Sequence, residues 1–447
     1  MSYLKPADAA WLNMERPDNL MNINGLLFFK GSLERERLAG VLERRLCCFE
    51  RFRMRVVPQA LGVPCWELDP EFDIHRHLIY EELSHPTRAE VLERAGQFMG
   101  QPMDRDRPLW EFRVFPGVEE GVVIIVRLHH AIADGIALMR VLLAMCDLEP
   151  DGDCEIRDGV GGEEHRKASV VTWIKSHLSR FLHKSHDLLF HPDEAAEAAS
   201  LGLKAGLSLK RLVALPPDRD TPFRGKLGLK KVAAISEPLE LDEVKHAAKR
   251  LGCTINDFLM AALSGGFRRS LLRREALEPE AEIRVVCPVD LRGGDISELG
   301  NHFGLVFLTL PVGETSAAER LRRIRSSMNE LKGSAEAIIV FEVLSTLGMI
   351  PAEFEKPIVE WFGSKASAVV TNLPGPKHKL YLAGAELDSV MYWVPQSGAL
   401  GLGVSIMSYA GRVRIGVAGD SGLIREPNLI IEDFLCEYQE LLSLEAL

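Results

Sequence analysis

Two adjacent histidines, His129 and His130, are the residues of this sequence best suited to chemistry. They end the apolar segment GVVIIVRLHH and precede the turn AIADG, which holds Asp134 and Gly135. Because successive side chains of a regular strand face opposite ways, the two imidazoles cannot share one pocket. An imidazole at the end of a buried strand can stay neutral near physiological pH, as a general base that removes a hydroxyl proton requires. The pattern favours one catalytic and one packing histidine.

Two other interpretations of this segment stay open on spacing alone. Adjacent histidines after an apolar strand are more often structural than catalytic. Two histidines and a carboxylate can also hold non-haem iron or zinc, although the opposed faces of strand neighbours weaken that reading. Asp134 could orient the turn or pair with an arginine, and Gly135 would let the chain turn sharply.

Other familiar catalytic motifs do not occur in the chain. There is no GxSxG elbow, no Walker GxxxxGK[ST] and no HExxH, and GALGLG lacks the third glycine of a dinucleotide fingerprint. The enzyme classes that depend on these motifs are therefore excluded.

The elements that must position the histidines are alternating strands and helices. A strand at 26–29 precedes a helix with Ser32 as a possible N-cap, and Thr87 with Glu90 predicts a capping box that opens another helix. The strand that ends at the histidine pair is followed by a helix starting near Asp134. From residue 230 onward a second mixed pattern of strands and helices begins, and it closes with a helix near 427–443.

We predict an α/β fold with mixed sheets in two lobes. An N-terminal lobe spans 1–150, a helical connection spans 151–222 and a C-terminal lobe spans 223–447, because the composition turns Gly- and acid-rich after Pro150. The uncharged stretch 389–411 is long enough to cross a bilayer, but its Pro, Gln, Gly and Ser residues favour two buried strands joined by a turn.

Composition places the chain among ordinary globular proteins. Of its 447 residues, 47% are hydrophobic and 26% are charged, and the formal net charge is -11. That charge argues against binding to nucleic-acid phosphates. The 8 cysteines form no CxxC pair and the first residues contain no apolar signal-peptide run, so we expect a reducing, cytoplasmic setting.

The motif HHAIADG resembles the HHxxxDG motif of the bacterial wax ester synthase and acyl-CoA:diacylglycerol acyltransferase family, part of the wider two-lobed, chloramphenicol acetyltransferase-like group of CoA-dependent acyltransferases. The resemblance covers nearly the whole chain, through blocks in the family's order: LKPADAAWL near the start, DRPLWEF at 106–112, NDFLMAAL from Asn256, PVDLR at 288–292, GNHFG at 300–304, TNLPGPKHKLYLAGA at 371–385 and SYAGRVRIGVAGD at 408–420.

The resemblance implies a role for each motif residue. His130 would be the general base that deprotonates the acceptor alcohol as it attacks the acyl-CoA thioester, without a covalent acyl-enzyme. The acceptor would be a fatty alcohol or a diacylglycerol, and no metal or bound redox cofactor is implied. Asp134 would be structural and paired with an arginine, for which Arg292 is our candidate.

The tetrahedral intermediate of such a reaction needs hydrogen-bond donors for its oxyanion. Asn256 and Asn301 lie in blocks similar to the family's and carry amide NH2 donors, with Asn372 as a third candidate. A helix N-cap for Asn256 and turn positions for Asn301 and Asn372 are the structural alternatives. The Trp of the PLW block is interpreted as core.

The sequence departs from the family's blocks at two places. Thr371 stands where the family often has serine, and Phe223-Arg224-Gly225 stands where it has an LNG-like block. A basic excess between Lys204 and Lys231 could receive CoA phosphates or form a solvated face. The basic amphipathic helix predicted over 165–191 could lie on an anionic lipid surface, or cover the gap between the lobes.

Overall fold

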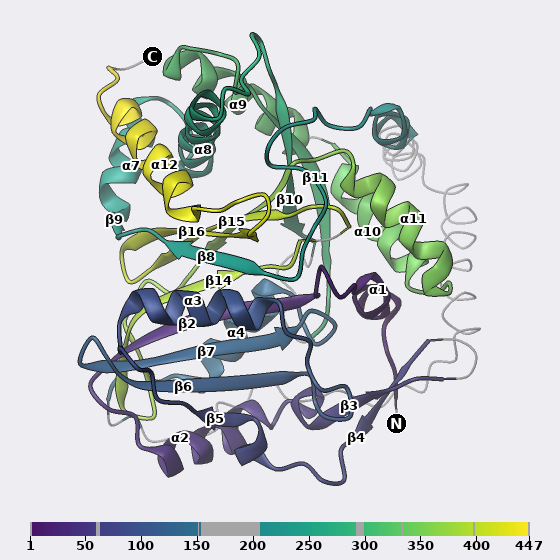
Figure 1. The fold of residues 1–447 in the computed structure, drawn as a ribbon, viewed down its shortest axis with the longest axis vertical. Coiled ribbons are helices and arrows are strands. Elements are labelled where there is room, and N and C mark those ends of the chain that lie inside the picture. Colours follow the sequence, from purple (N-terminus) through teal and green to yellow (C-terminus); the bar gives the residue numbers. More distant parts are fainter. Residues whose placement is uncertain are drawn as a thin grey trace, which may run out of the picture.

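The computed structural model describes residues 2–59, 63–150, 152, 206–291, 299–332, 334–396 and 398–445. Two lobes are stacked on each other, each built around one large sheet (Figure 1). Both sheets mix parallel and antiparallel pairs, since β5 runs parallel to β6 in one and β12 runs parallel to β10 and β15 in the other. The predicted α/β class with mixed sheets is confirmed.

The N-terminal lobe holds a six-stranded sheet in the order β13-β14-β2-β7-β6-β5. All nine residues of β7 are buried, which matches its unbroken apolar sequence and places its carboxyl end inside the molecule. The strands of this sheet are β2 (Asn22–Lys30), β5 (Leu78–Tyr80), β6 (Trp110–Val118), β7 (Gly121–His129), β13 (Leu380–Leu382) and β14 (Ala385–Trp393).

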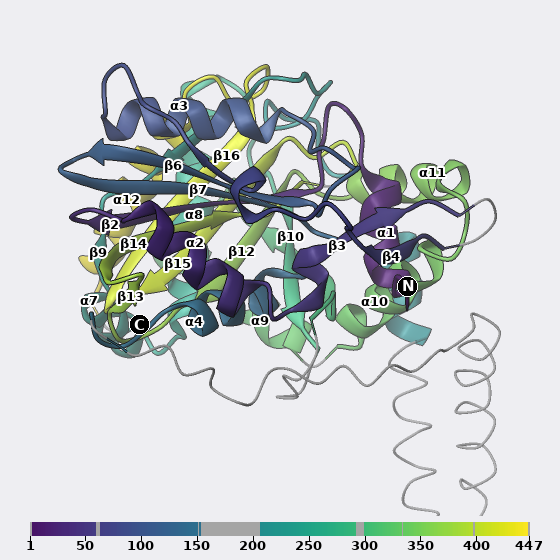
Figure 2. The same cartoon turned by 90° about the horizontal axis from the view of Figure 1, so that it is seen from below.

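Helices cover both faces of this sheet. Figure 2 shows α3 (Arg88–Met99) on one side of β6 and β7 and α2 (Arg35–Val41) and α4 (Gly135–Met145) on the other. Thr87 caps α3 by accepting the Glu90 N–H, but the Glu90 carboxylate accepts from His85 N, so the predicted box is only half formed. The prediction of Ser32 as an N-cap is wrong, because α2 begins at Arg35 after an extended Glu34.

The C-terminal lobe contains a seven-stranded sheet in the order β11-β10-β12-β15-β16-β8, with the short β9 also paired to β16. Its strands are β8 (Lys231–Ile235), β9 (Leu239–Glu240), β10 (Ile283–Asp290), β11 (Phe303–Leu310), β12 (Ala368–Pro374), β15 (Leu402–Tyr409) and β16 (Arg412–Asp420). The helices of the second half are α7 (Leu241–Arg250), α8 (Ile255–Arg273), α9 (Ala317–Lys332), α10 (Glu336–Leu347), α11 (Ala352–Gly363) and α12 (Pro427–Leu442).

The N-terminal sheet includes strands from the second half of the sequence. Strand β14 pairs antiparallel with β2, so a hairpin from the second half of the sequence completes the N-terminal sheet. The uncharged stretch 389–411 does form strands, as predicted, but they are parts of β14 and β15 in two different sheets. The predicted boundaries at 150 and 223 divide the chain by sequence alone. They do not predict that a hairpin from the last segment joins the N-terminal sheet.

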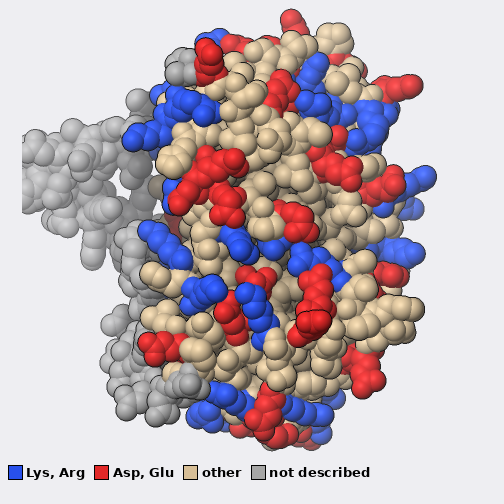
Figure 3. Space-filling view, turned by 90° about the vertical axis from the view of Figure 1, so that its left-hand side faces the viewer, with Lys and Arg blue, Asp and Glu red and all other residues tan. Residues whose placement is uncertain are grey.

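A small sheet and one helix complete the N-terminal region. Strands β1 (Ser2–Tyr3), β4 (Cys65–Leu68) and β3 (Met54–Val57) form a three-stranded sheet, and α1 (Pro6–Met14) packs beside α10 and α11 (Figure 1). In the described ranges no helix is both long and apolar enough to cross a bilayer, and all seven described cysteines are free. The face in Figure 3 mixes acidic and basic side chains without one large patch of either sign.

Candidate active site

The imidazole of His130 lies where the two lobes meet. His129 is the last residue of β7 and His130 begins the turn after it, and both side chains are buried. The His130 ring stacks on Trp11 of α1 with 3.9 Å between ring centroids, and Phe303 of β11 lies 5.7 Å away on the C-terminal side. Aromatic rings from both lobes thus hold this imidazole in a fixed plane.

Asn301 of the C-terminal lobe fixes the tautomer of His130. The Asn301 Nδ2 group donates to Asp8 Oδ1 and to the main-chain oxygen of His130, both at 2.8 Å. Neither partner can donate, so the atom at 2.7 Å from His130 Nδ1 must be the amide oxygen. His130 Nδ1 therefore carries the hydrogen and donates it. Its Nε2 keeps a free lone pair, as a general base requires.

A buried carboxylate stands behind Asn301. Asp8, on α1, accepts from both the main-chain N–H and the side-chain amide of Asn301, at 2.9 and 2.8 Å. Its other oxygen accepts from Arg51 Nη1 at 2.9 Å, and the same nitrogen also donates to Ile132 O in the motif turn. Gly300, with a φ of 128°, is the residue that lets the chain reach Asn301 beside this ion pair.

The surroundings of His130 favour the neutral imidazole. Burial among aromatic rings lowers its pKa to about 4, against smaller opposing contributions from the Asp134 charge and the Asn301 hydrogen bond. Asn301 offers a neutral oxygen rather than a charge, so it orients the ring without strongly favouring the imidazolium. The site thus holds a histidine that is unprotonated at any physiological pH.

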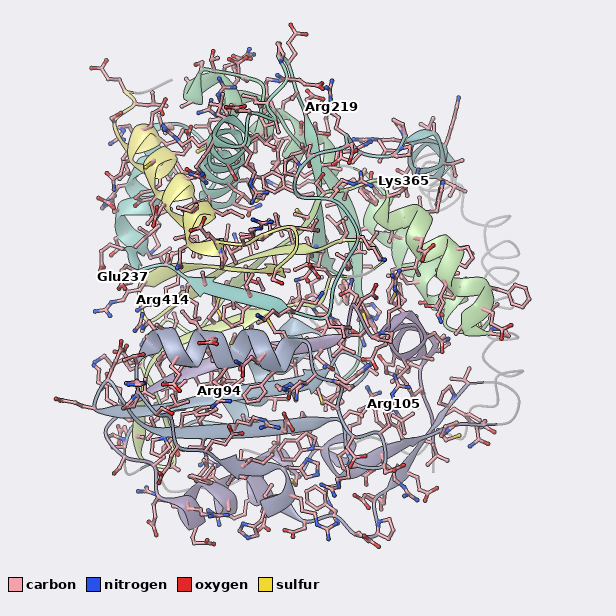
Figure 4. All side chains as sticks on the ribbon, viewed as in Figure 1. Arg94, Arg105, Arg219, Glu237, Lys365 and Arg414 are labelled. Carbon is pink, nitrogen blue, oxygen red and sulfur yellow. The ribbon has the colours of Figure 1, made fainter. Side chains whose placement is uncertain are left out.

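His129 points away from this cluster and contacts a carboxylate. Its Nδ1 accepts the Ala131 N–H at 3.0 Å, so Nε2 carries the hydrogen and donates to Glu15 Oε2 at 3.1 Å. Arg105, which lies near α1 in Figure 4, donates to the other Glu15 oxygen at 2.6 Å. Burial alone would raise the pKa of Glu15, but the hydrogen bond from His129 and the hydrogen bond and charge of Arg105 lower it to about 2.

Asp134 and Gly135 join the motif to the C-terminal lobe. Asp134 caps α4 by accepting Ala137 N–H, and its second oxygen accepts the His302 N–H, both at 3.0 Å. A side chain at Gly135 would come within 3.2 Å of Leu373. The predicted structural role of Asp134 has this geometric basis, while its predicted partner Arg292 lies outside the described residues.

The three asparagines fall into two separate places. Asn301 contacts His130 directly, and both hydrogens of its amide are already donated, which leaves none for an oxyanion. Asn372 Nδ2 donates to Asn256 Oδ1 at 2.9 Å, in the segment beside Leu373 and Gly135. Asn256 is not the N-cap of α8, because Thr254 and Asp257 form a complete capping box there.

Sequence reasoning missed the contribution of α1. Asp8, Trp11 and Glu15 recur at helical spacing, and this face of the chain meets both histidines. A lone acid within the alanine-rich PADAAW was a usable signal, since an acid on a buried helix face needs a partner. Trp110, which the sequence indicates as a core residue, is buried, and its indole N–H donates to Phe52 O.

Thr371, one of the departures from the family's blocks, bridges two strands. Its hydroxyl donates to Ser405 Oγ at 3.2 Å between the parallel strands β12 and β15. Among the residues that the structure describes, no group of three or more His, Cys, Asp or Glu side chains is arranged to hold a metal ion. His129 and His130 themselves have separate partners.

Comparison with known proteins places the chain in a family. Residues 4–259 match the wax ester synthase/diacylglycerol acyltransferase catalytic domain, and residues 299–442 match the C-terminal domain of the same family. A putative diacylglycerol O-acyltransferase of Mycobacterium tuberculosis is 29% identical over 465 residues, covering 99% of this chain and 90% of the relative. A second, probable diacylglycerol O-acyltransferase of that species is 27% identical, covering 95% and 92%.

Solved structures show the same architecture. The wax ester synthase/diacylglycerol acyltransferase from Marinobacter aquaeolei VT8 superimposes with a TM-score of 0.69 at 21% identity, over 99% of this chain and 98% of the other. The first condensation domain of the calcium-dependent antibiotic synthetase gives 0.64 at 14% identity, over 100% and 97%. The predicted two-lobed acyltransferase fold is thereby confirmed, and the chain belongs to the wax ester synthase/diacylglycerol acyltransferase family.

Proposed function

We propose that this acyltransferase moves a fatty acyl group from acyl-CoA to a fatty alcohol or a diacylglycerol, with His130 as general base. The products are wax esters or triacylglycerols. The observation that carries the proposal is the tautomer of His130, whose Nδ1–H is donated to Asn301 while Nε2 stays free. The family relationship supports acyl-CoA as the donor and an alcohol or diacylglycerol as the acceptor.

In the proposed reaction, His130 Nε2 accepts the hydroxyl proton of the acceptor as its oxygen attacks the thioester carbonyl. The tetrahedral intermediate then expels the CoA thiolate. An imidazole whose pKa is about 4 forms an imidazolium that loses its proton readily, and a thiolate, with a pKa near 8.5 for an ordinary thiol, accepts it. The same nitrogen thus takes the proton from the alcohol and returns it to CoA.

Asn301 and Asp8 act as positioning residues in this proposal. When the imidazolium forms, its Nδ1–H stays hydrogen-bonded to the Asn301 oxygen. The Asp8 carboxylate holds Asn301 by one hydrogen bond from its main-chain N–H and one from its side-chain amide. Asp134 and Gly135 fix the turn against the C-terminal lobe. The proposed oxyanion donors are the amides of the Asn256–Asn372 pair, whose neighbour Leu373 lies against Gly135 of the motif turn.

We also propose contact with a lipid surface, because both acceptors are water-insoluble. The segment predicted to do this, 165–191, lies outside the described residues, so the proposal rests on its basic amphipathic sequence. The full chain should sediment with anionic liposomes at low salt and be released at high salt. A chain that stays in the supernatant at low salt would contradict peripheral binding.

The function is tested by following thiol release and ester formation together. Palmitoyl-CoA is supplied with hexadecanol or with dipalmitoylglycerol, and the acceptor that gives equal amounts of thiol and ester identifies the activity. His130→Ala should remove nearly all of both products while its circular dichroism stays unchanged. Wild-type protein that releases no thiol with either acceptor would instead favour another hydroxyl acceptor or a lipid-binding role.

A further inference from the structure

A basic pocket of about 540 Å³ lies in the C-terminal lobe, apart from the His130 cluster. Helices α8 and α12 run side by side there (Figure 1), and the last turn of α8 meets the loop that leads into α12. None of its lining residues contacts His130 or Asn301. The polar residues that line it are Arg224, Ser270, Arg273, Arg274, Arg425 and Glu426, and leucine, isoleucine and proline side chains form the rest of the wall.

The four arginines are unequally neutralised. Arg273 forms a bidentate ion pair with Asp433, at 2.8 and 2.6 Å. Arg224 and Arg274 donate only to main-chain carbonyls, those of Asp218, Pro222 and Leu423, which leave their charges uncompensated. Arg425 is exposed and has no partner among the described residues. Three positive charges therefore face one acidic lining residue, Glu426.

Positive charge gathers in the wall of the pocket. Ser270 also belongs to this wall, but its side chain is fully buried and takes no part in the open surface. Burial and the charge of Arg273 lower the pKa of Arg274, as expected where cations gather without an anion.

We propose that this pocket binds the phosphate group of a small phosphorylated ligand, with the arginine side chains as donors. Guanidinium groups match phosphate oxygens in geometry, and the volume suits a ligand of nucleotide size. The apolar wall from Leu423, Leu429 and Ile430 would take the uncharged part. Arg224 belongs to the Phe-Arg-Gly block in which this sequence departs from its family's pattern.

Two sources of that phosphate are distinguishable. One is the nucleotide portion of acyl-CoA, and this source rests on the proposed function. The other is a soluble phosphorylated compound that occupies the pocket independently of turnover. Either would use the same donors, so binding and kinetics must be measured separately.

The test uses the full chain at low ionic strength, with inorganic pyrophosphate and 3′,5′-adenosine bisphosphate as probes in isothermal titration calorimetry. The double variant Arg224→Gln/Arg425→Gln should weaken binding of both probes at least tenfold, since each charged hydrogen bond carries a large share of the affinity. Ser270→Ala, a change in the buried part of the wall, should leave binding of both probes unchanged. Each single variant, Arg224→Gln or Arg425→Gln, is matched by the control Arg412→Gln, an exposed arginine at the opposite end of β16 from the pocket, because each of these changes removes one positive charge.

The outcomes decide the proposal without depending on activity. Binding of the probes that is lost in the arginine variants of the pocket and kept in Arg412→Gln supports the proposal. A raised KM for palmitoyl-CoA in the same variants then assigns the phosphate to CoA. An unchanged KM assigns the phosphate to a separate ligand. No binding to wild type, or equal weakening by Arg412→Gln, overturns it. If the chain proves inactive, the calorimetry still reports on the pocket.

Discussion

The two neighbouring histidines occupy opposite kinds of environment. His129 donates to the charged Glu15 carboxylate, which Arg105 also contacts, whereas His130 is enclosed by Trp11 and Phe303 and donates to a neutral amide. The carboxylate accepts a hydrogen bond from the His129 ring and fixes its orientation, while the apolar enclosure of His130 stabilises the neutral imidazole. Identical side chains one residue apart are thereby given different chemistry by what α1 and the Asn301 segment place next to each of them.

The largest expected difference comes from truncating each histidine in turn. His130→Ala should reduce kcat by about 10²–10⁴-fold, the usual contribution of a general base. His129→Ala should keep kcat within about tenfold but lower the free energy of unfolding by about 1–3 kcal/mol, since Glu15 would lose a buried donor. Steady-state thiol release and urea unfolding measure the two effects. Equal loss of kcat in both variants would contradict the division of roles.

Removing the side chain that fixes the tautomer of His130 should have the next largest effect on kcat. Asn301→Ala deletes the acceptor for His130 Nδ1–H, and we expect kcat to fall by about 10–100-fold, the usual loss when a supporting hydrogen bond to a functional histidine is removed. The ¹⁵N shifts of the imidazole should show one tautomer in wild type and a mixture in the variant. A folded variant with one unchanged tautomer would show that Asn301 does not set it.

The titrations of His130 and of Glu15 should lower the free energy of unfolding in different pH ranges. The pKa of His130 falls to about 4 in the fold from 6.5 unfolded, so the unfolded chain binds the extra proton first and stability drops as pH falls from 6.5 to 4, by about 3 kcal/mol. For Glu15 the folded pKa of about 2 lies below 4.5, so its contribution is present above pH 4.5 and is lost toward pH 2.

Denaturant unfolding from pH 7 to 3 checks these ranges. His130→Ala should flatten the curve between pH 6.5 and 4, and Glu15→Gln should flatten the part below 4.5. An unchanged slope between pH 6.5 and 4 in His130→Ala would mean that His130 titrates normally in the folded protein.

The smallest expected effect on turnover concerns Glu15 itself. Glu15→Gln keeps an acceptor for His129 Nε2–H but removes the charge that Arg105 contacts, so kcat should change less than about threefold. Arg105→Gln is the matched variant, because it removes the other member of the partly exposed pair. A large loss of kcat in Glu15→Gln would mean that the His129 side also takes part in catalysis.

Local features of this chain could be predicted from sequence, but contacts between distant segments could not. The buried strand β7, the α4 start at Asp134 and the Thr87 cap follow from patterns within a few residues. The pairing of β14 with β2 and the approach of Asp8 to Asn301 join residues hundreds of positions apart, and no periodicity encodes them. The resemblance to a family singled out His130 as the candidate base, but not the contacts by which α1 holds its ring.

Because β14 completes the N-terminal sheet, one edge of β2 lacks its partner during most of the synthesis of the chain on the ribosome. Strand β2 is complete at Lys30, but the neighbour that covers its open edge ends at Trp393, 363 residues later. At about 5–20 residues per second, that edge stays without its native neighbour for roughly 20–70 s in each new chain. An uncovered strand edge is a template for pairing with another chain, so this edge of β2 is the place where a nascent N-terminal sheet is most exposed to aggregation until β14 emerges.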